Sequence, residues 1–357
     1  MAELRQNTWT LGEWYDQDYA GNVSYTANDP GQLWNVGSNS KGELGQNNRT
    51  QYSSPVQVPG TTWLSVSSGS QLVLAMKTDN TLWAWGSNEV GELGQNQAEG
   101  QLNSTSSPVQ IPGTTWSKIS TAGGNDAAAA IKTDGTLWTW GSNSQYGVLG
   151  HNESGYNARK SSPTQVPGTW SSIDIADACC IGLKTDGTLW TWGRNRNGAL
   201  GQNQNQGSTP GTNSISSPTQ IAGDWSGSKI FGANNGGAVK SDGTLWIWGQ
   251  NDWGQLAQNN RIHRSSAVQI PGTTWSIVSH RKNMVVGMKT DNTLWVWGRN
   301  NDGSLGINLS GDDRSGVSSP TQIPGTTWAA VKTSGSSTIA TKTDGTLWTW
   351  GSRSGGR

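Results

Sequence analysis

The 357-residue sequence predicts an all-β protein, a seven-bladed β-propeller built from four-stranded antiparallel blades. The string Thr-Leu-Trp-x-Trp-Gly occurs six times, and a weaker copy at residues 32–37 precedes them. The central leucines of the seven copies are 49, 55, 52, 56, 49 and 53 residues apart. Self-similarity at such a period is the signature of a solenoid or a propeller, so it decides the fold class before any local pattern does.

Each repeat is expected to form four short strands, as the unit that begins at Trp116 illustrates. Strands are predicted over residues 116–119, over the apolar run 127–131, over 137–140 and over the Ser-Ser-Pro-Thr-Gln-Val segment at 161–166. Asp-Gly between the second and third runs favours a tight hairpin, and Asn80 and Asn292 suit the same turn because asparagine tolerates positive φ. Pro163 lacks a backbone N–H, so the fourth strand should place it at a strand end or on an edge.

The 22 tryptophans follow the repeat. One tryptophan opens each unit, and six units carry a Trp-x-Trp pair, with Trp34 alone in the first. Rings two residues apart project from the same face of a strand, which a neighbouring blade would bury. We therefore expect at least 20 of the 22 tryptophans to form a core between blades; only Trp14 and Trp253 fall outside the pattern.

The whole chain, residues 1–357, is predicted to be one domain. Its units run approximately over 9–60, 63–113, 116–168, 170–223, 225–272, 275–325 and 328–351, the last completed by residues 1–8. The last unit lacks its Ser-Ser-Pro strand, whereas residues 4–9 resemble the end of the segment 55–63. We infer that an N-terminal strand around residues 2–6 joins the last blade, which would close the ring and remove an exposed sheet edge.

Composition argues against several classes of partner. The 24 basic and 24 acidic side chains balance and no basic tract occurs, so nucleic acid is not an expected partner. No window approaches the roughly 18 apolar residues of a membrane span, and the N-terminus lacks a signal-peptide pattern. We expect a soluble protein without membrane insertion, cytoplasmic or assembled into a virus particle. The adjacent Cys179 and Cys180 are expected to be small buried residues.

Recurring motifs make the chain resemble the regulator of chromosome condensation repeat family. They are the string DGTLWTWGSN at 134–143, a Gly-x-Leu-Gly turn at 42–45, 91–94 and 198–201, and Ser-Ser-Pro-x-Gln. The resemblance covers essentially the whole chain and implies a seven-bladed propeller whose two ends meet in one blade. Near-identical repeats rich in Gly, Asn, Gln, Ser and Thr also look like bacterial and bacteriophage members of the family. That likeness suggests a virion or phage-tail component.

Segments that differ between repeats are the candidate binding surfaces, because surface loops on a rigid scaffold usually carry function. One set is the turn between the first and second strands, and the other is the long loop after Trp-Gly. Neutral drift of solvated turns is the alternative. The candidate interaction residues are Trp14, Tyr15, Asp16, Asp18, Tyr19, Trp253, His280, Arg281 and Lys282. The aromatic and acidic segment 14–19 suits a protein interface, or a cap over the ring closure.

The predicted function is that of a non-enzymatic structural or adaptor module with protein partners. The three histidines sit in unrelated units, so no catalytic, cofactor-binding or metal-binding residues are assigned and no cofactor is expected. A glycan or small-ligand receptor is the alternative interpretation. The family's namesake is a nucleotide-exchange factor that uses a long inserted wedge. Because the intervals from Trp-Gly to the next Ser-Ser span only 16 to 23 residues, that activity is the least favoured.

Overall fold

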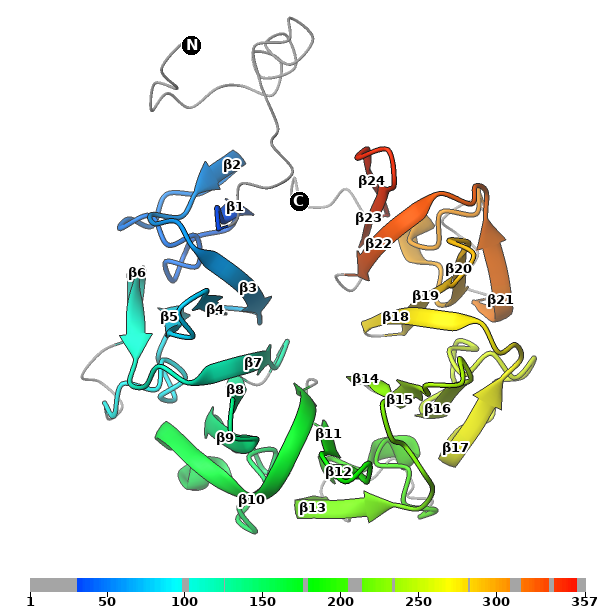
Figure 1. The fold of residues 1–357 in the computed structure, drawn as a ribbon, viewed down its shortest axis with the longest axis horizontal. Coiled ribbons are helices and arrows are strands. Elements are labelled where there is room, and N and C mark those ends of the chain that lie inside the picture. Colours follow the sequence, from blue (N-terminus) through cyan, green and yellow to red (C-terminus); the bar gives the residue numbers. More distant parts are fainter. Residues whose placement is uncertain are drawn as a thin grey trace, which may run out of the picture.

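The described strands form a ring of blades around a central axis (Figure 1). The computed structural model describes residues 31–97, 103–124, 126–175, 179–204, 214–232, 235–281, 283–308, 316–333 and 337–351. The strands are β1 (Trp34–Gly37), β2 (Tyr52–Gln57), β3 (Trp63–Ser68), β4 (Leu72–Lys77), β5 (Leu82–Ser87), β6 (Ser104–Ile111), β7 (Trp116–Thr121), β8 (Ala127–Lys132), β9 (Thr136–Gly141), β10 (Lys160–Ile175), β11 (Cys179–Lys184), β12 (Leu189–Gly193), β13 (Ile215–Ile221), β14 (Lys229–Gly232), β15 (Asn235–Val239), β16 (Leu245–Gly249), β17 (Arg264–Ile270), β18 (Trp275–Arg281), β19 (Met284–Lys289), β20 (Leu294–Gly298), β21 (Val317–Ile323), β22 (Trp328–Thr333), β23 (Ser337–Lys342) and β24 (Leu347–Gly351).

Sheet order follows the chain, as in a propeller. Blade 1 comprises β1–β2, blade 2 β3–β6, blade 3 β7–β9 with the first part of β10, blade 4 the rest of β10 with β11–β13, blade 5 β14–β17, blade 6 β18–β21 and blade 7 β22–β24. The predicted all-β propeller of antiparallel blades is therefore confirmed. The strand expected to close the ring, at residues 2–6, lies outside the described residues.

Short 3-10 helices lie in three of the loops that follow Trp-Gly within the described ranges. They are η1 (Tyr156–Ala158), η2 (Arg196–Gly198) and η3 (Asn301–Gly303). No helix in this part of the protein is long and apolar enough to cross a lipid bilayer.

The hairpin between the second and third strands forms as predicted, for a reason visible in its side chains. In blade 2 the Asp79 carboxylate accepts hydrogen bonds from the Thr81 backbone N–H (3.0 Å) and hydroxyl (2.7 Å). These bonds lower the pKa of Asp79, the side-chain bond most. Trp83 Nε1 then donates to Thr81 Oγ1 at 2.9 Å, and Asn80 takes a φ of 61° in the turn. The same chain of bonds recurs at the hairpins that begin at Asp134, Asp186, Asp242, Asp291 and Asp344.

Strand β10 is the one departure from separate blades. The sequence predicts a strand ending at Val166 and another starting at Trp170, but β10 runs through both without a break. It pairs with β9 as far as Thr169 and with β11 from Trp170 onward. This connection reads Pro-Gly-Thr-Trp, one residue shorter than the Pro-Gly-Thr-Thr-Trp at 59–63, 112–116, 271–275 and 324–328. The connection at 222–225 is equally short, but there β13 ends at Ile221 and the strand does not continue.

The core lies between blades, as the tryptophan pattern predicts. The second ring of the Trp-x-Trp pair is fully buried in blades 2–6, and its Nε1 donates to a loop carbonyl of the preceding blade. Trp85 donates to Glu43 O and Trp140 to Glu92 O, both at 2.8 Å. Leu72, Leu74 and Leu82 of blade 2 share one apolar cluster with rings of blade 3.

Two tryptophans differ from the expected core. Trp34 is 53% exposed and Trp348 is 47% exposed. They stand in blades 1 and 7, at the two ends of the described chain. The expectation that at least 20 tryptophans are core therefore fails for these two rings. It is untested for Trp9, which lies outside the described residues.

Candidate functional site

Both sets of repeat-divergent segments lie on one face of the propeller. Because consecutive strands run antiparallel, the connections alternate between the two faces. The turn between the first and second strands and the long loop between the third and fourth share one face, here called the loop face. The Lys-Thr-Asp-Gly hairpins and the Pro-Gly-Thr-Thr connections share the other, the hairpin face. Backbone bonds join turn and loop within a blade, as from Ser142 N to Asp126 O (3.1 Å) and from Arg299 N to Asn283 O (2.9 Å).

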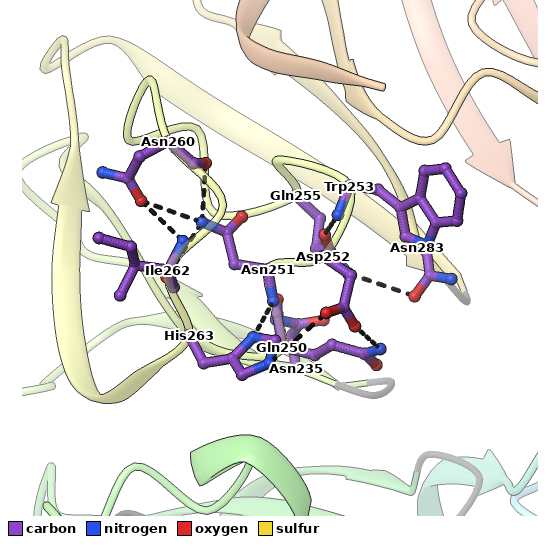
Figure 2. Close-up of polar contacts among 10 residues, drawn as sticks. All are labelled: Asn235, Gln250, Asn251, Asp252, Trp253, Gln255, Asn260, Ile262, His263 and Asn283. Carbon is purple, nitrogen blue, oxygen red and sulfur yellow. Dashed lines mark hydrogen bonds and ion pairs between the residues drawn. The ribbon is translucent and has the colours of Figure 1, made fainter. Parts of the chain in front are cut away.

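A repeated asparagine organises each long loop from inside. Two residues after Trp-Gly, its Oδ1 accepts the backbone N–H of the loop leucine, as between Asn251 and Leu256 (2.8 Å) or Asn39 and Leu44 (2.9 Å). Asn251 Nδ2 also donates to the carbonyls of Asn260 (3.0 Å) and Ile262 (3.1 Å). This buried side chain thus holds both ends of its loop, and the residues between them are presented in a fixed conformation (Figure 2).

Blade 5 adds a polar cluster found in no other described repeat. The backbone N–H of Asn251 donates to His263 Nδ1 at 2.9 Å, which places the imidazole proton on Nε2. Nε2 lies 3.5 Å from Asp252 Oδ1, and Gln250 Nε2 donates to the other carboxylate oxygen of Asp252. Figure 2 shows these side chains converging at the foot of the loop. Because both ring nitrogens are engaged within the loop, the pair is suited to bracing it rather than to acid–base chemistry.

The same loop is tied to blade 6. Gln255 Oε1 accepts the backbone N–H of Trp253 (2.9 Å), and Gln255 Nε2 donates to Asn283 Oδ1 (3.2 Å) in the turn of blade 6. Asn235 Nδ2 donates to the carbonyls of Trp248 (3.1 Å) and Gln250 (2.6 Å) at the base of the cluster (Figure 2).

Trp253 is half-buried at the boundary between blades 5 and 6. The Arg299 guanidinium of blade 6 lies 4.5 Å from the centre of its ring. Tyr146 occupies the equivalent position in blade 3, and the guanidinium of Arg194 in blade 4 lies 4.8 Å from its ring. An arginine–aromatic contact therefore joins neighbouring blades at two of the blade boundaries.

Near the central axis, hydrogen bonds join the inner strands of successive blades. The Ser67 hydroxyl accepts the Thr121 N–H at 3.1 Å, and the Ser279 hydroxyl accepts the Thr333 N–H at 3.0 Å. In blade 4 the equivalent residue is Asp174, whose carboxylate accepts from Ser120 Oγ (3.0 Å) and from Gly232 N (2.7 Å).

The charges near the axis are mixed. Burial raises the pKa of Asp174, against the opposing effects of its two hydrogen bonds and of the Lys332 and Arg281 charges. Burial also raises the pKa of Asp126, helped by the charges of Glu92 and Glu89. Sequence reasoning missed Asp174. The available signal was an aspartate at an inner-strand position where blades 2, 3 and 6 carry serine.

The three residues of the predicted basic cluster, 280–282, do not form one exposed group among the described residues. His280 is buried, with its ring 6.4 Å from that of Phe231 in an edge-to-face arrangement. Arg281 is half-buried and reaches across the axis, because a Cβ built on Gly123 of blade 3 would overlap its guanidinium. Lys282 lies outside the described residues, as do Trp14, Tyr15, Asp16, Asp18 and Tyr19. Of the predicted interaction residues, the structure thus places Trp253 and Arg281, both half-buried, on the loop face, whereas His280 is buried.

The two cysteines are buried, as expected. Burial raises the pKa of the Cys180 thiol well above its ordinary value, with the neighbouring Cys179 and Asp174 acting in the same direction. Cys180 Sγ donates to Val148 O at 3.0 Å. Within the described residues, no group of three His, Cys, Asp or Glu side chains is arranged to hold a metal ion.

Comparison with known sequences identifies the repeat. The regulator of chromosome condensation (RCC1) repeat pattern matches residues 30–76, 79–131, 134–180 and 186–230, more than half of the chain. Protein RCC2 homolog of Danio rerio is 34% identical over 138 residues, which are 36% of this chain and 26% of that protein. The ultraviolet-B receptor UVR8 of Arabidopsis thaliana is 27% identical over 186 residues, 49% of this chain and 39% of the receptor. The matches thus span about a quarter to two fifths of these relatives.

Solved structures share the fold. Yeast RCC1 (Prp20), in its complex with Kap60, superposes with a TM-score of 0.76 at 20% identity, covering 98% of this chain and 86% of that one. Human WBSCR16 gives a TM-score of 0.73 at 17% identity, covering 91% and 89%. At these identities the likeness establishes the propeller fold alone.

Proposed function

The chain belongs to the RCC1 repeat family, and from that premise we propose that it is a non-enzymatic protein-interaction module whose binding surface is the loop face. One observation carries the proposal. The segments that differ between otherwise near-identical repeats are gathered on one face, and buried asparagines hold them in fixed conformations. Pre-organised loops lose little conformational entropy on binding, which favours affinity.

The relatives supply the kind of partner. Yeast RCC1 has been seen bound to the protein Kap60, so a propeller of this family forms protein complexes. The relatives reported above come from animals, plants and yeast, and none supports a virion or phage-tail setting. We therefore retain an adaptor role and set aside the particle setting as unsupported.

Side-chain chemistry on the loop face fits a protein partner better than a glycan. The Trp253 ring is already covered on one side by arginine, whereas the half-buried Arg281 offers positive charge at the centre of the face. Aromatic and arginine side chains are the residue types that dominate binding energy at protein interfaces.

The test is to purify the tagged chain from its native source, identify bound proteins by mass spectrometry, and isolate one partner. That partner should slow amide exchange in loop-face segments such as 250–263 and leave hairpin-face segments unchanged. Trp253→Ala combined with Arg281→Ala should weaken its affinity by at least about tenfold. The control, Thr273→Ala with Thr326→Ala on exposed hairpin-face positions, should not.

Protection confined to the hairpin face would refute the choice of surface. A chain that purifies alone and binds sugars on a glycan array would refute the adaptor function in favour of a receptor.

A further inference from the structure

The hairpin face carries a groove that the proposed function does not use. Its volume is about 550 Å³, and it crosses blades 3, 4 and 5. Its walls come from β7, from the blade 4 part of β10, from the β11–β12 hairpin and from the start of β14. This volume falls within the roughly 300–1,000 Å³ of ordinary ligand pockets.

The groove exists because blade 5 enters its first strand differently. In blades 2, 3, 6 and 7 the first strand begins at the opening tryptophan, but β14 begins only at Lys229, four residues after Trp225. The intervening Ser226-Gly227-Ser228 forms a turn in which Ser228 N donates to Trp225 O at 3.0 Å and Gly227 takes a φ of 69°. This turn builds one wall of the groove, opposite the β11–β12 hairpin.

Three lysines line the groove against one aspartate, a net charge of +2 on a chain that is neutral overall. Lys118 and Lys229 are exposed and occupy equivalent positions on the inner strands of blades 3 and 5, on either side of Ser172 in blade 4. No carboxylate among the described residues lies within ion-pair distance of any of these lysines.

Each ammonium keeps capacity for a ligand. Lys118 Nζ donates to Ser171 O, and Lys229 Nζ donates to Ser276 O at 2.9 Å, so each uses one of three N–H donors on a backbone carbonyl. Lys184 Nζ lies over the rings of Trp170 and Trp190, 3.8 Å from the centre of the latter. The one carboxylate, Asp186, is engaged by Thr188, whose hydrogen bonds lower its pKa.

The remaining lining is a mixture of hydroxyl and aliphatic groups. Ser171, Ser172 and Ser226 contribute hydroxyls, while Leu183 and Ile230 contribute apolar surface. Ser228 is 7% exposed, and its hydroxyl has no hydrogen-bond partner in the described structure. A ligand that fits such a lining carries carboxylates together with short apolar side chains.

We propose that this groove binds a short acidic peptide segment of a partner protein, with Lys118, Lys184 and Lys229 as the groups that receive its carboxylates. The site is separate from the loop face, so the propeller would engage two partners, or two parts of one partner, on opposite faces. Charge complementarity carries the choice of occupant, and the aliphatic lining favours a peptide over a nucleic acid, whose bases would need exposed aromatic faces for stacking.

The test uses the full chain and a fluorescein-labelled peptide of repeated Asp-Ile-Glu, with binding followed by fluorescence anisotropy. The wild-type chain should bind it, and added salt should weaken binding because the charges are solvent-exposed. Lys118→Gln with Lys229→Gln should raise Kd by about five- to tenfold, since each removes one exposed charge pair.

A matched pair of variants separates the groove from the fold. Lys184→Gln removes a lysine that lies over two tryptophans within the groove, and Lys289→Gln removes its equivalent in blade 6, outside the groove. Only Lys184→Gln should weaken binding of the peptide, while both substitutions should change the melting temperature of the protein equally. The proposal is overturned if the acidic peptide does not bind, if Lys289→Gln weakens it equally, or if a Lys-Ile-Lys peptide binds as well. Stronger binding of a single-stranded oligonucleotide of equal charge would overturn the choice of peptide.

Discussion

The repeated loop asparagine allows hydrogen-bond energies to be compared within one protein. Its copies occupy the same position in each repeat but differ in the number of acceptors to which Nδ2 donates. Asn39 and Asn251 each donate to two backbone carbonyls. Asn143 donates to one, Glu153 O at 2.9 Å. Asn195 and Asn300 have no acceptor for Nδ2 within the described structure. All five keep Oδ1 on the backbone N–H of the loop leucine.

Asparagine-to-aspartate substitution at these five positions should destabilise the protein in proportion to the bonds lost. The exchange preserves shape and the Oδ1 acceptor, and all five side chains are buried, so the cost of burying a carboxyl group is common to the series. At about 1 kcal/mol for each net hydrogen bond, Asn39→Asp and Asn251→Asp should cost about 2 kcal/mol more than Asn195→Asp and Asn300→Asp, with Asn143→Asp between them.

Urea unfolding followed by tryptophan fluorescence measures these differences, because unfolding exposes the buried rings. Equal destabilisation in all five variants would refute the idea that the amide donors stabilise the loops. An inverted order would show that the cost of burying a carboxyl group differs between blades. It would refute the assumption that this cost is equal in all five variants.

Three further predictions concern the ends, a buried acid and a thiol. Deleting residues 1–8 should lower the melting temperature far more than removing 352–357, because Leu347 of blade 7 is 63% exposed while its counterparts in blades 2–6 are fully buried; equal small effects would refute N-terminal closure. Because burial raises the pKa of Asp174, the folded protein holds a proton there at a pH where the unfolded chain, titrating near 3.8, has lost it. This group therefore lowers stability as pH rises from 3.8 through the folded pKa, and Asp174→Asn should remove that part of the decline; parallel curves of urea midpoint against pH for the two proteins would contradict it. Cys180 should react with iodoacetamide far more slowly in the native than in the denatured protein, because burial keeps its thiol protonated; mass spectrometry showing comparable rates would argue against that environment.

Repetition makes the architecture of this protein predictable from its sequence. The Asp-Gly and Asp-Asn hairpins and the Trp-x-Trp strands follow from the sequence because the same short-range bonds, from Trp83 to Thr81 to Asp79, recur in six of the seven copies. The unbroken strand β10 is not predicted, because the connections before Trp170 and Trp225 have the same length and only the first continues as one strand.

The candidate surfaces are less predictable, since they depend on which residues meet across blade boundaries. The strand order alone places the divergent segments on one face. The contact between Trp253 and Arg299, however, joins two different repeats, and no local sequence pattern predicts it. The groove depends on Ser226-Gly227-Ser228, which delays the start of β14 to Lys229, whereas the first strand of blades 2, 3, 6 and 7 begins at the opening tryptophan. The sequence shows these three residues, but their consequence is visible only when blades 3, 4 and 5 are seen together.

Strand β10 also bears on how the ring comes apart. Blades 3 and 4 share one continuous hydrogen-bonded sheet, whereas other blades meet through side chains and loops. Local opening proceeds in cooperative units that follow such backbone frameworks. Blades 3 and 4 should therefore open together as one foldon, with amides of β8 and β11 exchanging at a common rate. Under an applied force, blades 3 and 4 should therefore resist separation more than any other pair of neighbouring blades.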